Sequence, residues 1–348
     1  MKRNKTVMDS HTHLYASADG NPFGGFSAMD RFFRERALRG LCVNALGDPD
    51  HGGMVQNVTA ALYKLHNPQA YASGGFVYPS VPVEPPLPQG MDALTQYKEL
   101  MEIGFDGIKI LYKPTVQKKL SLPADAPFYE DMFAAAEKDA TPFVWHVADP
   151  PFFWDPGHVG AWSYGDGSYP SFETMLRQVF AVLEKHPRLT VSFAHFLFFS
   201  HRPQVLEQIF DRYPHVCIDV TPGTEMYGAF AERPDFYRSF LEKHADRILY
   251  GTDAEPPENP DCEGLADAVL RALTTEDEVV IWGLKTKGLA LSDKACEKIL
   301  AGNFLRLFGQ TPKPVNVAAL LRYIEKYEHL IADDVAKRYI LTEAARLA

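Results

Sequence analysis

The chain alternates between short runs of β-branched or aromatic residues and longer runs in which apolar residues recur at helical spacing. This alternation predicts repeated strand and helix units and a parallel sheet. The runs that we predict to be strands cover residues 7–15, 40–46, 71–78, 105–111, 142–147, 189–196, 216–220 and 247–253. Eight strands, with a helical interval between each and the next, form a closed (β/α)₈ barrel, the TIM barrel of the α/β class.

The chain beyond the last predicted strand is expected to be helical. Residues 292–308 carry apolar side chains on one side of a helix, and residues 315–347 add more helix. We find no Gly/Ser linker and no abrupt change of composition. We therefore expect a barrel over residues 1–310 and a C-terminal helical extension, 311–348, packed on it.

Composition excludes several classes of protein. Hydrophobic residues make up 46% of the 348 residues and charged residues 23%, which allows a large buried core. The net charge of -10 argues against nucleic-acid and anionic-membrane partners, because both need clustered Lys and Arg. The four cysteines form no Cys-x-x-Cys pair, so we expect buried thiols. With neither a secretory signal nor an apolar run of the ~20 residues that a membrane span needs, we expect a soluble, cytoplasmic protein.

The first predicted strand carries a pair of candidate metal ligands. Successive side chains of a strand point to opposite faces, so Asp9, His11 and His13 share one face and the two imidazoles project the same way. Zinc needs three or four protein ligands, and a catalytic site keeps one position open. The pair therefore requires partners from later strands.

Further polar residues stand at or near the ends of the later strands. The active site of such a barrel is built at the carboxyl ends of its strands. The candidates at that edge are Lys109, His146, His195 and Asp253. Together with the opening pair they predict a mononuclear zinc site, or part of a site with two metal ions.

Several short stretches resemble the amidohydrolase superfamily, and within it amidohydrolase family 2, the amidohydrolase-related proteins. The matching stretches are Met8-Asp9-Ser10-His11-Thr12-His13, Trp145-His146-Val147, Phe193-Ala194-His195-Phe196, Tyr250-Gly251-Thr252-Asp253 and the closing helix at 299–309. The resemblance covers residues 8 to about 309 and leaves the C-terminal tail outside it.

The resemblance implies a role for each matching residue. His11, His13 and His146 would coordinate the metal. Asp253 would bind it, act as general base on the bound water, or do both. His195 would be a ligand of a second metal or a polarising group that faces the substrate. This fits the chemistry of a divalent metal, which brings the pKa of water down to ~7 and lets a nearby carboxylate take its proton.

Lys109 leaves the number of metal ions open. In members of the superfamily with two metals, a lysine on the fourth strand is carboxylated and bridges the ions. In others, a free lysine meets a substrate carboxylate. Strand parity allows either role, since Ile108 and Ile110 would then face the helices. Zinc is the expected ion, and Mn²⁺, Fe²⁺ and Co²⁺ suit the same histidine and carboxylate ligands.

The loop at 149–164, after the fifth strand, is rich in aromatic residues. Loops after barrel strands form substrate pockets, so we interpret it as a pocket wall, with an oligomer contact as the alternative. His158, Trp162 and Tyr164 are its candidates for substrate contact. We predict that Asp9 orients the site from behind the ligands. No motif supports a role for the remaining acidic residues of the mouth, which are Asp149, Glu173 and Asp219.

The sequence thus predicts a metal-dependent hydrolase that cleaves an amide, ester or lactone of a small polar substrate with a metal-activated water. Asp253 would move the proton, while His195 or Lys109 would stabilise the oxyanion or bind a carboxylate. The first alternative is a non-oxidative, metal-dependent decarboxylase, because the resembling branch includes such enzymes. The second is a barrel that binds a ligand without catalysis. Neither a nucleic acid nor a membrane is expected as a partner, whereas a homo-oligomer is possible.

Overall fold

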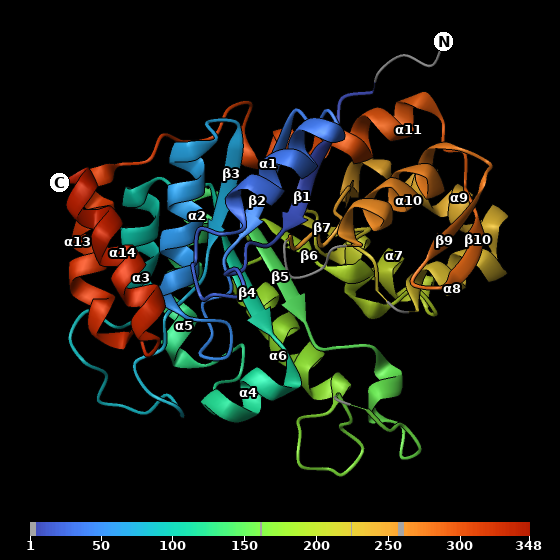
Figure 1. The fold of residues 1–348 in the computed structure, drawn as a ribbon. Helices are drawn as coiled ribbons and strands as arrows, with labels where there is room; N and C mark the ends of the chain where they lie inside the picture. The colour runs from blue at the N-terminus through green and yellow to red at the C-terminus, as the bar shows by residue number, and fades with distance from the viewer. Residues whose placement is uncertain (1–4, 161, 224, 257–260) are drawn as a thin grey trace.

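Eight parallel strands form a barrel, in the order in which they occur in the chain (Figure 1). The structure, a computed structural model, describes residues 5–160, 162–223, 225–256 and 261–348. The strands are β1 (Met8–Thr12), β2 (Gly40–Asn44), β3 (Ala70–Gly74), β4 (Gly107–Tyr112), β5 (Phe143–Val147), β6 (Val191–Phe193), β7 (Val216–Asp219) and β8 (Ile248–Leu249). The predicted (β/α)₈ fold is confirmed.

Backbone hydrogen bonds join the first strand to the segment around the last one and complete the ring. Ser10 N donates to Tyr250 O at 3.0 Å, and Asp253 N donates to His11 O at 2.8 Å. His13 N donates to Ala254 O, also at 2.8 Å. The backbone of the predicted Asp253 ligand is therefore tied directly to the strand that carries the histidine pair.

Helices cover the outside of the barrel. They are α1 (Phe26–Glu35), α2 (Met54–His66), α3 (Ala93–Ile103), α4 (Pro114–Leu120), α5 (Pro127–Asp139), α6 (Phe172–Lys185), α7 (Pro203–Arg212), α8 (Met226–Glu232), α9 (Pro234–Lys243), α10 (Cys262–Thr274), α11 (Asp293–Glu297), α12 (Asn303–Phe308), α13 (Val317–Tyr327) and α14 (Asp334–Leu347). A π-helical turn, Lys298–Gly302, joins α11 to α12.

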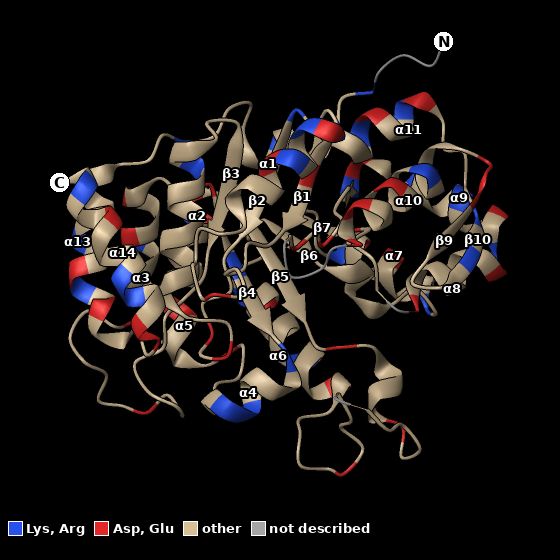
Figure 2. Cartoon of the chain, in the orientation of Figure 1, with Lys and Arg blue, Asp and Glu red and all other residues tan. Residues whose placement is uncertain are grey.

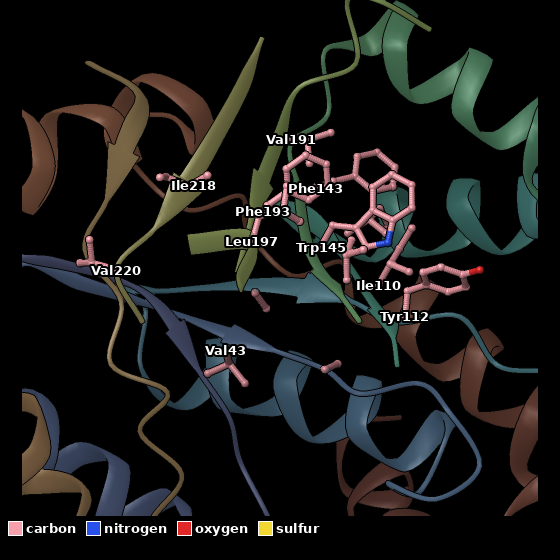
Figure 3. Close-up of a cluster of buried hydrophobic side chains, with 14 of the residues drawn as sticks. Val43, Ile110, Tyr112, Phe143, Trp145, Val191, Phe193, Leu197, Ile218 and Val220 are labelled. Atoms are coloured by element: carbon pink, nitrogen blue, oxygen red, sulfur yellow. The ribbon is translucent and has the colours of Figure 1, made fainter. Parts of the chain in front are cut away.

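The two faces of each strand have different neighbours. On β5, Phe143 and Trp145 are buried in an apolar cluster (Figure 3), and Trp145 stacks on Phe133 of α5 at 5.5 Å between ring centroids. His146, the residue between Trp145 and Val147, therefore points into the barrel. The helices thus fix which residues of a strand reach the site.

The chain after β8 is not entirely helical, so that prediction is wrong in one segment. Strands β9 (Glu278–Ile281) and β10 (Leu284–Lys287) pair as an antiparallel hairpin. Strand ends also differ from the prediction, since β6 and β8 are short and their polar residues His195 and Asp253 lie in the connections that follow.

The C-terminal helices lie beside α2 and α3 (Figure 1). Asn57 of α2 donates a hydrogen bond to the hydroxyl of Tyr323 at 2.8 Å. Lys326 of α13 donates to Glu99 of α3 at 2.6 Å. Residues 317–347 are therefore packed on the outside of the barrel.

The charged side chains and the cysteines are distributed as the composition led us to expect. Basic and acidic side chains are interspersed on the outer helices in the view of Figure 2. The four cysteines are free and buried. No helix in the described ranges is long and apolar enough to cross a membrane.

Candidate metal centre

His11, His13 and Asp253 converge at the carboxyl ends of β1 and β8. One ligand atom from each residue can be chosen so that all three lie within 4.8 Å of one another. Asp253 Oδ1 lies 3.3 Å from His13 Nε2 and 3.5 Å from His11 Nε2. Two imidazole nitrogens and a carboxylate oxygen form a donor set that suits zinc and related divalent ions.

The hydrogen bonds behind the two imidazoles determine which nitrogens face this group. His13 Nδ1 lies 2.7 Å from the carbonyl oxygen of Asn44, which can only accept a hydrogen bond. His11 Nδ1 lies 3.0 Å from Asp219 Oδ2. In the neutral imidazoles the proton is therefore on Nδ1, and each Nε2 directs a lone pair to the site, where that of His11 accepts a hydrogen bond from Lys109 Nζ.

These lone pairs make the group suitable for a cation. Burial lowers the pKa of His13, and it lowers the pKa of His11 to about 4 with Lys109 adding to the effect, so both rings are neutral at pH 7. His13 Nε2 then faces the oxygen of Asp253 with no proton between two electron-rich atoms. A metal ion at this position would relieve that contact, and the residues therefore fit the metal that the sequence predicts.

Lys109 supplies a positive charge inside the barrel. It is buried on β4, and its Nζ donates a hydrogen bond to His11 Nε2 at 2.8 Å. The neighbouring residues, Ile108 and Ile110, are part of the apolar cluster, as strand parity predicts. Burial lowers the pKa of Lys109 to about 8. Because this amine uses the lone pair of His11 that a metal would use, the contact and metal coordination through that nitrogen exclude each other.

His195 begins a left-handed turn. The backbone φ angles of His195, Phe196, Leu197 and Phe198 are 55°, 58°, 51° and 53°. A left-handed backbone conformation costs roughly 1–2 kcal/mol for each residue that is not glycine. The turn directs the His195 ring towards His11, at 5.5 Å between centroids, and stacks Phe198 on it at 5.3 Å.

His146 lies next to His195 but outside the group of three. Its ring is 4.8 Å from that of His195 between centroids. His146 Nε2 donates to the carbonyl oxygen of Ala148 at 2.9 Å, which leaves Nδ1 as the acceptor. A ligand role for His146 would therefore use Nδ1 or require the bond to Ala148 to break.

Asp9 supports the backbone of both ends of the site. It accepts hydrogen bonds from His11 N at 3.1 Å and from the hydroxyl of Thr252 at 2.6 Å. Gly251 permits this close approach, because a Cβ there would lie 2.9 Å from that of His11. These contacts are consistent with the predicted orienting role of Asp9. They hold the segment before Asp253 against the strand that carries the two histidines.

Two carboxylates with no expected role, Asp219 and Asp149, contact residues of the site. Asp219 bonds to His11, as described above. Asp149 accepts a hydrogen bond from the hydroxyl of Tyr164 at 2.6 Å, and its Oδ1 lies 3.6 Å from both His146 Nε2 and Lys113 Nζ. The position of Asp219 at the end of β7 and of Asp149 just after β5 was the available sequence signal.

The two aromatic candidates of the loop after β5 have different surroundings. Tyr164 is buried, and its hydroxyl is committed to Asp149. Trp162 is 52% exposed, and Lys113 Nζ lies 5.0 Å above the centre of its ring. Ala161 of the same loop lies outside the described residues. Trp162 is therefore exposed, Lys113 lies between its ring and Asp149, and the hydroxyl of Tyr164 is buried against the same carboxylate.

The buried imidazoles predict that the metal-free protein is less stable in acid. Burial lowers the pKa of His11 from 6.5 to about 4 and that of His146 to about 3. Burial also lowers the pKa of His13, so between pH 6.5 and 4 the unfolded chain binds protons at three imidazoles that the folded protein leaves neutral. Burial raises the pKa of Asp9 from 3.8 to about 7, so the folded protein holds about one proton there that the unfolded chain releases. Three imidazoles outweigh this one carboxyl group, so the unfolded chain binds more protons than the folded protein at these four residues.

We expect the free energy of unfolding to fall as the pH is lowered from 6.5 to 4. Urea unfolding at pH 6.5, 5.5 and 4.5 measures it. Equal stability at all three values would contradict the buried, neutral state of these imidazoles.

Solved structures that resemble the chain are distant in sequence. A TIM-barrel protein from Bordetella bronchiseptica, described as uncharacterised, is 18% identical, with a TM-score of 0.56 over 88% of this chain and 99% of that one. A probable 2-pyrone-4,6-dicarboxylic acid hydrolase from Acinetobacter baumannii, solved with citric acid, is 12% identical, with a TM-score of 0.54 over 87% and 99%. The 5-carboxyvanillate decarboxylase of Sphingomonas paucimobilis is 14% identical, with a TM-score of 0.52 over 88% and 99%. At these identities the likeness supports the fold alone.

Sequence comparison identifies the family. No curated protein sequence matches the chain. The family model described as amidohydrolase matches residues 8–310, which include all eight barrel strands and the three converging donors. The resemblance inferred from the short motifs is confirmed, and the protein belongs to the amidohydrolase family.

Proposed function

We propose that the protein is a metal-dependent hydrolase that cleaves an amide, ester or lactone bond of a small substrate carrying a carboxylate. The observation that supports it best is the contact between the Nε2 lone pairs of His11 and His13 and the carboxylate of Asp253. Asp253 is partly exposed and Lys109 already donates to His11 Nε2, so the unrelieved contact is the one between His13 Nε2 and Asp253, which a shared cation would stabilise. The family membership supports the same class of chemistry.

His11, His13 and Asp253 would hold the ion, most plainly one Zn²⁺, with Mn²⁺ as the alternative. When bound, a divalent ion acts as a Lewis acid that lowers the pKa of water and polarises a carbonyl group. A single ion is supported by the three donors that converge in the described part of the chain. A second ion would need a carboxylated Lys109, which remains the alternative.

The chain's own residues would move the protons. Asp253 Oδ2 would take a proton from the attacking water and pass it to the leaving group. His195 Nδ1 lies 3.2 Å from the carbonyl oxygen of Pro222, so Nδ1 carries the proton in the neutral ring. Its Nε2 is then an acceptor. His195 would therefore act as a base when neutral and stabilise an oxyanion only after protonation.

Lys113 would bind the carboxylate of the substrate. It lies just after β4, at the start of α4, and its contact with Asp149 after β5 places it at the carboxyl ends of the strands. Its side chain is 19% exposed and lies 3.6 Å from Asp149, with which a substrate carboxylate would share the ammonium group. Two structural relatives are named for carboxylic acids, and one was solved with citric acid.

Replacing Lys113 with methionine is expected to raise KM for a carboxylate substrate by roughly 10-fold to 100-fold while kcat changes little. A hydrogen bond to a charged group contributes about 1.5–3 kcal/mol, and this one would act equally on the bound substrate and the transition state. Steady-state kinetics separates the two constants. Lys118→Met is the matched control, because that lysine on α4 bonds to Ser168 and stacks on Tyr169 at the surface. A fall in kcat alone would contradict the binding role.

A non-oxidative decarboxylase is the second candidate. The same metal group and Lys113 would suit an aromatic acid, and one structural relative is named as a decarboxylase. The two reactions differ in their products, because hydrolysis of a lactone or ester releases a proton and decarboxylation releases CO₂. Proton release in weakly buffered solution and CO₂ release from a panel of lactones and aromatic acids distinguish them.

Metal binding tests the proposal as a whole. The chelator-treated protein is titrated with Zn²⁺ or Mn²⁺ and assayed against the same panel. We expect one equivalent to bind and to restore turnover. Failure to bind either ion would reject the proposal and favour a barrel that binds ligands without catalysis.

A further inference from the structure

Asp219 lies at the end of β7 and uses both of its oxygens. It is buried, with 1% of the residue exposed. Oδ2 lies 3.0 Å from His11 Nδ1, while Oδ1 accepts hydrogen bonds from the backbone of His195 at 2.9 Å and of Thr221 at 3.1 Å. One carboxylate therefore connects a residue of β1 with the turn that follows β6.

We infer that Asp219 is a positioning residue that fixes the tautomer of His11 and the left-handed turn carrying His195 through a single carboxylate. An ionised carboxylate only accepts hydrogen bonds, so it holds the proton of His11 on Nδ1, and Nε2 is left with the lone pair that accepts from Lys109 Nζ. Carboxylates behind metal-binding histidines commonly act in this way. The inference rests on the proposed function only for its effect on metal binding.

The second oxygen acts on the turn. His195 is its first residue and has a left-handed backbone, as do the three residues after it. The hydrogen bond from His195 N to Asp219 anchors the start of this turn, while Leu197 N donates to the carbonyl oxygen of Ala194 at 3.0 Å. The direction of the His195 ring therefore depends on the same side chain as the tautomer of His11.

An amide of the same shape cannot do both tasks. Asparagine offers one acceptor oxygen and one NH₂ donor. If its oxygen faces His11, its NH₂ meets the two backbone N–H groups of His195 and Thr221, and donors oppose donors. If its oxygen faces the turn, its NH₂ meets His11 Nδ1, which must then accept, and the proton moves to Nε2 and displaces the hydrogen bond from Lys109 Nζ. The first arrangement releases the turn, and the second blocks the nitrogen that would bind the metal.

The tautomers can be read from the histidine ¹⁵N shifts of the metal-free protein. In the wild type we expect His11 and His13 in the Nδ1–H form. In Asp219→Asn we expect His11 to move to the Nε2–H form, or the His195 resonances to shift and broaden. His13 is an internal control, because its proton is held by the backbone carbonyl of Asn44, which the substitution does not touch. We expect Zn²⁺ affinity to fall by roughly 10-fold to 100-fold.

Thr221→Val is the matched variant. It removes the hydroxyl that lies 3.3 Å from His11 Nδ1 and keeps Asp219, so the His11 tautomer should stay as in the wild type. The inference is overturned if wild-type His11 is in the Nε2–H form, an outcome that needs no variant to fold. It is also overturned if Asp219→Asn leaves both histidines and the Zn²⁺ affinity unchanged. If the tautomer shifts but the wild type binds no metal, the positioning role stands and the proposed function fails.

Discussion

Replacing Asp253 with asparagine is expected to lower Zn²⁺ affinity by more than 100-fold and turnover by roughly a thousandfold. Asp253 is the anionic member of the group formed with His11 and His13. The substitution removes both the charge that attracts the ion and the base that takes the proton. Loss of a supporting residue alone costs roughly 10-fold to 100-fold in metal affinity, and loss of a general base roughly 10²-fold to 10⁴-fold in rate.

Competition with a chromophoric chelator measures the affinity, and steady-state assays measure turnover. His13→Gln should reproduce the loss of metal. His186→Gln is its control, because that imidazole is also buried but lies at the end of α6, with Glu130 at 3.6 Å as its charged neighbour. Wild-type affinity in Asp253→Asn would remove the residue from the metal site.

Replacing Asp106 with alanine is expected to lower the free energy of unfolding by roughly 3–5 kcal/mol. Asp106 precedes β4 and pairs with Lys64 of α2 at 2.6 Å, with both side chains buried. It also accepts the backbone N–H groups of Ala72 and Lys313, at 2.9 and 2.7 Å. The alanine leaves two amides without an acceptor and a buried ammonium whose remaining partner is the carbonyl oxygen of Gly104.

Burial shifts both partners towards their neutral forms, since it lowers the pKa of Lys64 and raises that of Asp106. Burying the pair therefore costs free energy, and removing one partner costs more, because the other charge stays buried without it. Urea unfolding tests the effect against Glu102→Ala, which removes the exposed partner of Arg322 and should cost at most about 1 kcal/mol. Equal losses in the two variants would contradict this explanation. Lys64→Met with Asp106→Leu should recover only part of the loss, because the two amides stay unpaired.

The barrel was predictable because each strand repeats one local pattern. On β5, large apolar residues alternate with Val144 and His146, and strand parity alone sends Trp145 to the helices and His146 to the interior. The hairpin β9–β10 escaped prediction for the opposite reason. Its strands have four residues each, too few for a periodic signal.

The candidate residues of the site were also predictable, but their arrangement was not. His11, His13 and Asp253 could be named because imidazole and carboxylate groups at strand ends suit a metal. The partner of His13 is a backbone carbonyl, which no residue type reveals. The turn at His195 contains no glycine, the residue type that usually indicates a left-handed backbone. Its four successive left-handed residues therefore could not be predicted.

By itself, the sequence determined the strand order, the inward face of each strand and the residue types that reach the mouth. These follow from alternation and burial, which act between near neighbours in the chain. Only the tertiary structure decided that His11 and His13 present their Nε2 atoms, that His146 Nε2 bonds to Ala148, and that Asp219 joins β1 to the turn after β6. Those outcomes depend on hydrogen bonds between segments far apart in the chain, and the direction of such a bond is set only when the barrel closes.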